Sequence, residues 1–175
     1  KLSRHFNPPK PIVSYRITNV AQYLLEGKDP QRIALRFPQS HYTYEALATH
    51  ASEVATYLLT VGAKKGDPVL LISDNSFFWV ACYLGIMQAG LVCVPIAANS
   101  RSQDIDYVLE TTAARIVCTQ GSIATAQDSM FAGRHLLTDK EVPPLEQTAS
   151  QVGFLSLGTD TTATHSWTPI EPNAL

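Results

Sequence analysis

The chain has 175 residues, of which 45% are hydrophobic and 16% are charged, and its formal net charge is −2. The hydrophobic content excludes general disorder, and the slightly acidic balance argues against nucleic acid or an anionic membrane as the main partner, because both require a basic face. A charged fraction below the roughly 25% of ordinary soluble domains indicates a large core or a surface covered by something else. The length fits one domain or one lobe of a larger protein.

The first predicted elements are a short helix and a hairpin. Residues 1–17 form a proline-containing arm, after which Thr18 or Asn19 is expected to cap the helix. Residues 33–37 alternate like a strand, with Ile33, Leu35 and Phe37 on one face, and the chain then turns back towards Tyr42 as a hairpin.

The clearest helix follows directly. Apolar side chains at intervals of three and four residues form one stripe over residues 44–59, with Thr43 as the N-cap and Gly62 as the C-terminal stop. The next residues form a polar turn. Its pair of cations, Lys64 and Lys65, is interpreted as solvated rather than as a phosphate site.

One long apolar stretch requires a membrane test. Residues 77–98 hold Gln88 as their only polar side chain and are numerous enough to span a bilayer. A helix over about residues 76–89, ended by Gly90 and followed by a buried strand over residues 91–96, explains the stretch without lipid. The sequence therefore predicts no membrane span.

The same stretch belongs to a strand–helix–strand unit. Residues 69–73 form an apolar run without alternation, which is typical of a strand covered on both faces, and residues 91–96 are predicted to be a second fully buried strand. Asn75 is the expected N-cap of the helix between them. Short joins predict parallel strands with a right-handed crossover. Gly85 within the helix is expected to mark a close approach to the sheet, because glycine there costs about 1 kcal/mol relative to alanine.

The remaining elements complete an α/β pattern. They are a helix over 103–112, a strand over 115–119, a short helix over 122–130 and a short strand over 135–138. The fold class is α/β, with a largely parallel sheet flanked by helices. The predicted organisation is an arm over residues 1–17, an α/β subdomain over 18–140 and a connection over 141–175, with a threonine-rich loop over 158–168.

No side-chain constellation in this sequence predicts an active site. Glycine-rich phosphate loops and the G-x-S-x-G nucleophile signature do not occur, and the five histidines are scattered. Asp104 and Asp106 are interpreted as the solvated start of a helix. Cys82, Cys93 and Cys118 lie in apolar runs without metal-ligand spacing and are expected to be buried, reduced thiols of a cytoplasmic protein. No catalytic, cofactor-binding or metal-binding residue is assigned.

Short sequence segments in the middle of the chain resemble one protein family. The resemblance rests on segments that stand in the order and at the spacing found near the start of acyl-adenylate-forming enzymes: 42–47, 61–62, 65–69, 74–76, 84–90, 94–96, 106–110 and 113–117. It covers roughly residues 18–120. This superfamily includes acyl-CoA synthetases, luciferases and the adenylation domains of peptide synthetases.

The resemblance implies an activity for a longer parent protein. Members convert a carboxylic acid and ATP into an acyl-adenylate and pass the acyl group to a thiol, so ATP, Mg²⁺ and CoA are the expected cofactors of the parent, which is read as acyl-CoA-synthetase-like and active in fatty acid metabolism. The family's phosphate loop follows the matched region, and residues 171–175 resemble its approach. The chain is therefore interpreted as a truncated N-terminal scaffold, inactive alone and without cofactors of its own. Its expected partners are the remainder of the adenylation domain, the parent's carboxylic acid and other copies of itself.

Two other classes remain open from the sequence. The chain could be a complete, small flavodoxin-like module that binds its ligand at the carboxyl ends of the strands. It could also be a non-catalytic remnant that binds a partner.

Overall fold

The computed structural model describes residues 19–141. In chain order its elements are α1 (Val20–Leu25), β1 (Ile33–Arg36), β2 (His41–Thr43), α2 (Tyr44–Thr60), β3 (Pro68–Ile72), α3 (Phe77–Gln88), β4 (Val92–Ile96), α4 (Ser102–Thr112), β5 (Ile116–Thr119), α5 (Gly121–Ala126) and β6 (His135–Thr138). The arm over residues 1–17, the loop over 158–168 and all but the first residue of the 141–175 connection lie outside the described residues.

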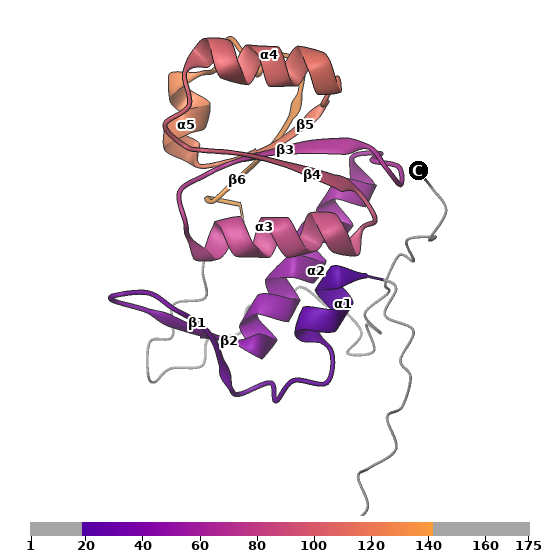
Figure 1. Cartoon of the computed structure of the whole chain (residues 1–175), viewed down its shortest axis with the longest axis vertical. Helices are drawn as coiled ribbons and strands as arrows, with labels where there is room; N and C mark the ends of the chain where they lie inside the picture. The colour runs from indigo at the N-terminus through magenta and orange to yellow at the C-terminus, as the bar shows by residue number, and fades with distance from the viewer. Residues whose placement is uncertain (1–18, 142–175) are drawn as a thin grey trace, which may run out of the picture.

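A four-stranded sheet in the order β4-β3-β5-β6 lies between α4 and α5 on one side and α3 on the other (Figure 1). Every neighbouring pair is parallel, and Leu70 of β3 lies between Val94 of β4 and Val117 of β5. The predicted parallel strand–helix–strand unit is therefore confirmed. The antiparallel β1–β2 pair forms a separate two-stranded sheet, which confirms the predicted hairpin.

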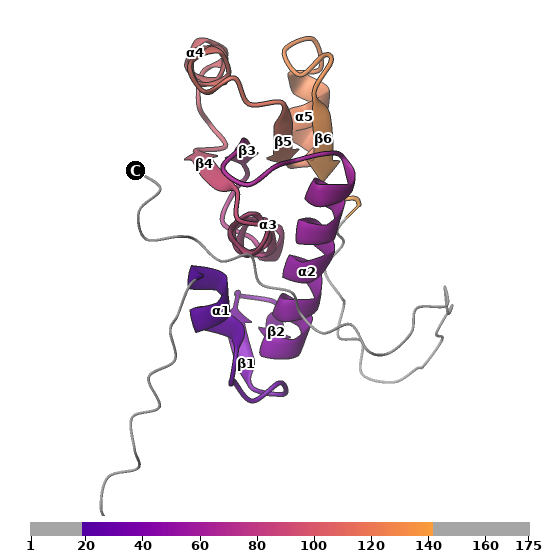
Figure 2. The same ribbon diagram turned by 90° about the vertical axis from the view of Figure 1, so that its right-hand side faces the viewer.

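Helices cover both faces of the sheet, as Figures 1 and 2 show. One face packs against α2 and α3 through a cluster that includes Leu58, Leu71 and Ile86. The other face packs against α4 and the α5 region through Leu70, Leu109 and Phe131. This layered arrangement confirms the predicted α/β class.

Burial separates the central strands from the edge strand. Residues Val69 to Ile72 of β3 are completely buried, as expected for a strand covered on both faces. The expectation that β4 is equally buried is wrong, because β4 lies at the sheet edge and Val92 is 50% exposed. The Val92 N–H donates to the Asp67 carbonyl and so points towards β3. Because N–H groups alternate in direction along a strand, position 95 faces away from β3. Pro95, which has no N–H, therefore removes no hydrogen bond from the sheet.

The close packing at Gly85 occurs against α2. A Cβ atom on Gly85 would lie 2.6 Å from the Ala51 carbonyl oxygen and 2.7 Å from the Val54 side chain. The expectation that Gly85 approaches the sheet is therefore wrong, since the limiting contact is between the two helices.

Hydrogen-bonded side-chain caps fix the starts of α1, α2 and α3, and α1 is capped by Asn19, one of its two predicted caps. Thr43 Oγ1 accepts from the Ala46 N–H at 3.2 Å at the start of α2, as predicted. At the start of α3 the cap is Ser76, whose Oγ accepts from the Trp79 N–H at 3.1 Å. The prediction of Asn75 was wrong by one residue, because either side chain can supply the acceptor that the first turn needs.

The apolar stretch over residues 77–98 is divided between α3 and β4, as predicted. Among the described helices, none has the length and apolar character needed to cross a membrane.

Candidate functional site

The carboxyl ends of β3 and β5 lie where the chain reverses its direction of travel through the sheet. The chain passes from β3 outwards to β4, then returns across β3 to β5 and β6. Ligands of open α/β sheets bind at such a switch point, outside the carboxyl ends of the strands. This edge is therefore the candidate functional site of the described residues.

Polar side chains join the two loops at this edge. The Gln120 side-chain oxygen, which follows β5, accepts from the Asp74 N–H at 3.1 Å. Ser73 Oγ, which follows β3, donates to the Asp74 carbonyl at 3.0 Å and lies 3.4 Å from Ser76 Oγ. These bonds fix the loop after β3 against the loop after β5.

Thr119 ends β5 with a hydroxyl that has no hydrogen-bond partner. The residue is completely buried, and its Oγ1 atom lies among the buried polar atoms that remain unpaired. An unpaired buried hydroxyl costs free energy because it has lost its hydrogen bonds to water.

We expect Thr119→Val to raise the free energy of unfolding by about 1 kcal/mol, because the substitution keeps the branched shape and removes the unpaired hydroxyl. Urea unfolding measures this change. Thr138→Val is the matched control, since the Thr138 hydroxyl donates to the Glu141 carboxylate at 3.2 Å and its loss is expected to destabilise the chain. A destabilised Thr119→Val protein would show that the hydroxyl is paired in solution.

The described residues do not fit ATP or Mg²⁺ at this edge. At the start of α5 the Gly121 N–H already donates to Asp139 Oδ1 at 2.8 Å, which is the position that a phosphate oxygen would take. Over residues 19–141, no group of three or more histidine, cysteine, aspartate or glutamate side chains could hold a metal ion. The chemistry available here is therefore hydrogen bonding by hydroxyl, amide and carboxylate groups.

The three cysteines are free thiols that lie within or beside the core. Cys82 and Cys118 are buried, and Cys93 is partly buried. Burial raises the pKa of the Cys82 thiol well above its usual range and that of Cys93 to about 12. Thiols held in the protonated form are poor nucleophiles, so these cysteines pack as small apolar residues.

The two aspartates singled out at the helix start do not form an acid–base pair. Asp104 accepts from Arg101 at 2.9 and 3.0 Å on the exposed first turn of α4, and Asp106 is exposed. The ion pair with Arg101 lowers the pKa of the Asp104 carboxyl. Both residues are solvated, as predicted.

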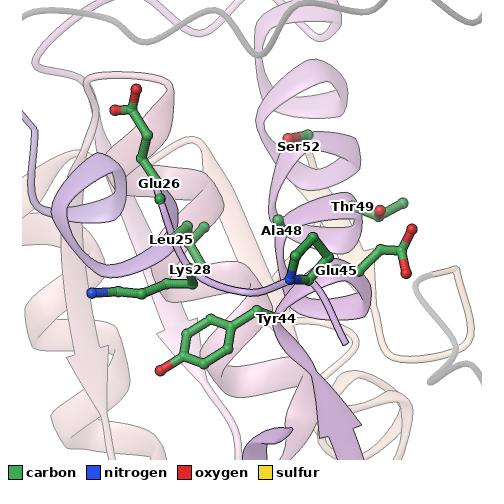
Figure 3. Close-up of a pocket in the computed structure, with 10 residues that line it drawn as sticks. Leu25, Glu26, Lys28, Tyr44, Glu45, Ala48, Thr49 and Ser52 are labelled. Carbon is green, nitrogen blue, oxygen red and sulfur yellow. The ribbon is translucent and has the colours of Figure 1, made fainter. Parts of the chain in front are cut away.

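A cavity of about 580 Å³ lies between the end of α1 and the first half of α2 (Figure 3). Leu25, Ala48 and Glu45 are among the residues that line it. The Glu45 carboxylate accepts from the Gln31 amide at 2.8 Å. The lining therefore combines apolar side chains with the charged groups of Glu26, Lys28 and Glu45.

A family comparison decides what this scaffold belongs to. Residues 26–171 match the family model described as AMP-binding enzyme. The chain belongs to this family. The resemblance read from the sequence is thereby confirmed, and the described fold is that of the N-terminal region of adenylate-forming enzymes.

Two curated relatives of this chain are much larger synthetases. The chain is 35% identical over 94 residues to the nonribosomal peptide synthetase sirP of Leptosphaeria maculans. This match covers 49% of the chain and 4% of that protein. It is 28% identical over 127 residues to bacitracin synthase 1 of Bacillus licheniformis, and this match covers 70% of this chain and 2% of that protein. Neither relative is named as a fatty acid acyl-CoA synthetase, so the fatty acid expectation receives no support from them.

Solved structures share the fold. The AMPPNP-bound nonribosomal peptide synthetase FmoA3 is 25% identical with a TM-score of 0.66, over 87% of this chain and 15% of that chain. A benzoate CoA ligase from Burkholderia xenovorans is 27% identical with a TM-score of 0.63, over 73% of this chain and 27% of that chain. The chain thus spans a small part of the proteins that it resembles.

Sequence reasoning did not locate the polar edge formed by Ser73, Asp74, Thr119 and Gln120. The available signal was positional, since these residues lie at the ends of two strands predicted to be parallel. Serine, aspartate, threonine and glutamine are common in loops, so these residue types alone do not distinguish a functional edge from an ordinary loop.

Proposed function

We propose that this chain is part of a ligase that uses ATP to convert a carboxylic acid into an acyl-adenylate and then passes the acyl group to a thiol. The match of residues 26–171 to the AMP-binding enzyme family carries the proposal and favours it over a self-contained binding module or a non-catalytic remnant. The described residues act as a scaffold, because their hydroxyl and amide groups at the sheet edge offer no counter-charge for a transferring phosphoryl group.

The acid is proposed to be an amino acid or an aromatic acid. The names of the relatives support this choice, since one curated relative and one solved structure are named as nonribosomal peptide synthetases and another solved structure is a benzoate CoA ligase. The acceptor thiol is either CoA or a carrier protein, and ATP and Mg²⁺ are bound by residues outside the described region.

The remainder of the adenylation domain is the proposed partner of the α3–β4 side. Trp79 and Tyr83 stack there with ring centroids 5.3 Å apart, both only partly buried, and Val92 of the edge strand is half exposed. An apolar surface of this kind marks an interface. Self-association of the isolated chain and the cytoplasmic location stay predictions.

The sequence encoded after Leu175 tests the proposal. We expect a Ser/Thr/Gly-rich loop that ends in a lysine within about twenty residues, because the family's phosphate loop follows the matched region. A reading frame that stops at Leu175, or that continues without such a loop, would contradict the ligase and favour the binding module.

A further inference from the structure

The amino-terminal edge of the four-stranded sheet carries four cations to which the proposed function assigns no role. Lys64 and Lys65 precede β3, Arg115 directly precedes β5, and Arg134 directly precedes β6. These three strands are parallel neighbours about 4.8 Å apart, so the residues before them stand side by side along one edge. Both lysines are exposed, and the Arg115 side chain is 75% exposed.

Arg134 is held in a fixed position beside a hollow. Its Nε donates to the Ala114 carbonyl at 3.3 Å and its Nη1 to the Met130 carbonyl at 2.7 Å. These bonds use two of the five guanidinium N–H groups. Arg134 and Arg115 both line a cavity of about 310 Å³, which Gly133 also lines. A fixed guanidinium beside a second arginine matches the two oxygens of a carboxylate.

The nearby carboxylates leave this edge with one excess positive charge. Asp67 accepts from the Lys64 N–H at 3.0 Å and lies 3.5 Å from Arg115 Nη2. Glu110 and Asp106 of α4 line the neighbouring cavity with Arg134. Four cations therefore face three carboxylates along this edge, within a chain whose net charge is −2.

We propose that this basic edge, formed by Lys64, Lys65, Arg115 and Arg134, docks an acidic protein segment, with one carboxylate of that segment held between the two arginines. A protein segment fits better than nucleic acid, because the row of cations is short and the net negative charge of the chain opposes a long polyanion. The edge is opposite the carboxyl ends of the strands, so docking there leaves the candidate site open.

Binding of a fluorescein-labelled oligoglutamate peptide to the full chain tests this proposal. Fluorescence anisotropy at about 0.01 M salt, where charges act over roughly 30 Å, is expected to show binding that weakens at about 0.1 M salt. Arg115→Glu and the double change Lys64→Glu with Lys65→Glu are each expected to weaken binding at least about tenfold. Arg134→Lys keeps the positive charge but removes the planar guanidinium, which can donate to both oxygens of a carboxylate. It is therefore expected to weaken binding as well.

Lys140→Glu is the matched control, since it makes the same charge change beyond β6 at the opposite edge. It is expected to leave binding within about twofold of the original chain. Circular dichroism melting verifies that each variant is folded. The proposal is overturned if the peptide does not bind, if Lys140→Glu weakens binding as much as Arg115→Glu, or if a short DNA duplex binds more tightly than the peptide.

Discussion

Gly85→Leu is expected to lower the free energy of unfolding by more than about 3 kcal/mol, beyond the usual range for overpacking a core. Even the Cβ atom of the new side chain would lie 2.6 Å from the Ala51 carbonyl oxygen and 2.7 Å from Val54. Both contacts are with the helix α2, and a backbone oxygen within a helix cannot move aside cheaply. The two helices would have to separate, which opens the core between them.

Gly85→Ala isolates the effect of close approach. Alanine favours a helix by about 1 kcal/mol over glycine, so an uncrowded position would become more stable. We expect Gly85→Ala to be destabilising despite this gain. Gly121→Ala is the control, because its nearest neighbour is the flexible end of the Lys140 side chain at 3.2 Å. Urea unfolding compares the variants, and a Gly85→Ala protein more stable than the original chain would refute the assigned helix contact.

Alkaline pH is expected to destabilise the folded chain strongly. Burial raises the pKa of Cys93 to about 12 and that of Cys82 well above its usual range. In the unfolded chain these thiols ionise near about pH 8.5. The folded state therefore keeps protons that the unfolded state releases, so the stabilisation is complete below about pH 8.5 and is lost as the pH rises towards about 12.

The slope of melting temperature against pH tests this expectation. Burial also raises the pKa of Tyr57, which contributes in the same direction. The informative quantity is therefore the difference in slope between the original chain and Cys93→Ala. We expect a shallower alkaline decline for Cys93→Ala, whatever its stability at neutral pH. Identical slopes would show that the Cys93 thiol does not stay protonated in the folded chain.

The sequence predicts the covered strands and the long helix well because their patterns report burial directly. The uninterrupted apolar run of β3 and the periodic stripe of α2 each identify one element and its buried faces. The apolar run of β4 misleads, since the sequence does not reveal that only β3 pairs with it. Pro95 was the available signal, because proline in a parallel sheet indicates an edge strand.

Contacts between distant elements account for the other errors. Gly85 was correctly recognised as a close approach, but its partner could not be read from the sequence because α3 packs against both α2 and the sheet. The polar edge at Thr119 and Gln120 was missed because it depends on strand order. Strand order is set by packing among all the helices, and no local pattern encodes it.

Acid-dependent exchange of pyrophosphate into ATP tests the central claim most directly. The purified 175-residue chain and the complete product of its gene are compared with a panel of amino, aromatic and fatty acids. We predict exchange with an amino or aromatic acid by the complete product, and background exchange by the 175-residue chain. Exchange by the 175-residue chain alone would contradict its assignment as a scaffold, and no exchange by the folded complete product with any acid would contradict the ligase.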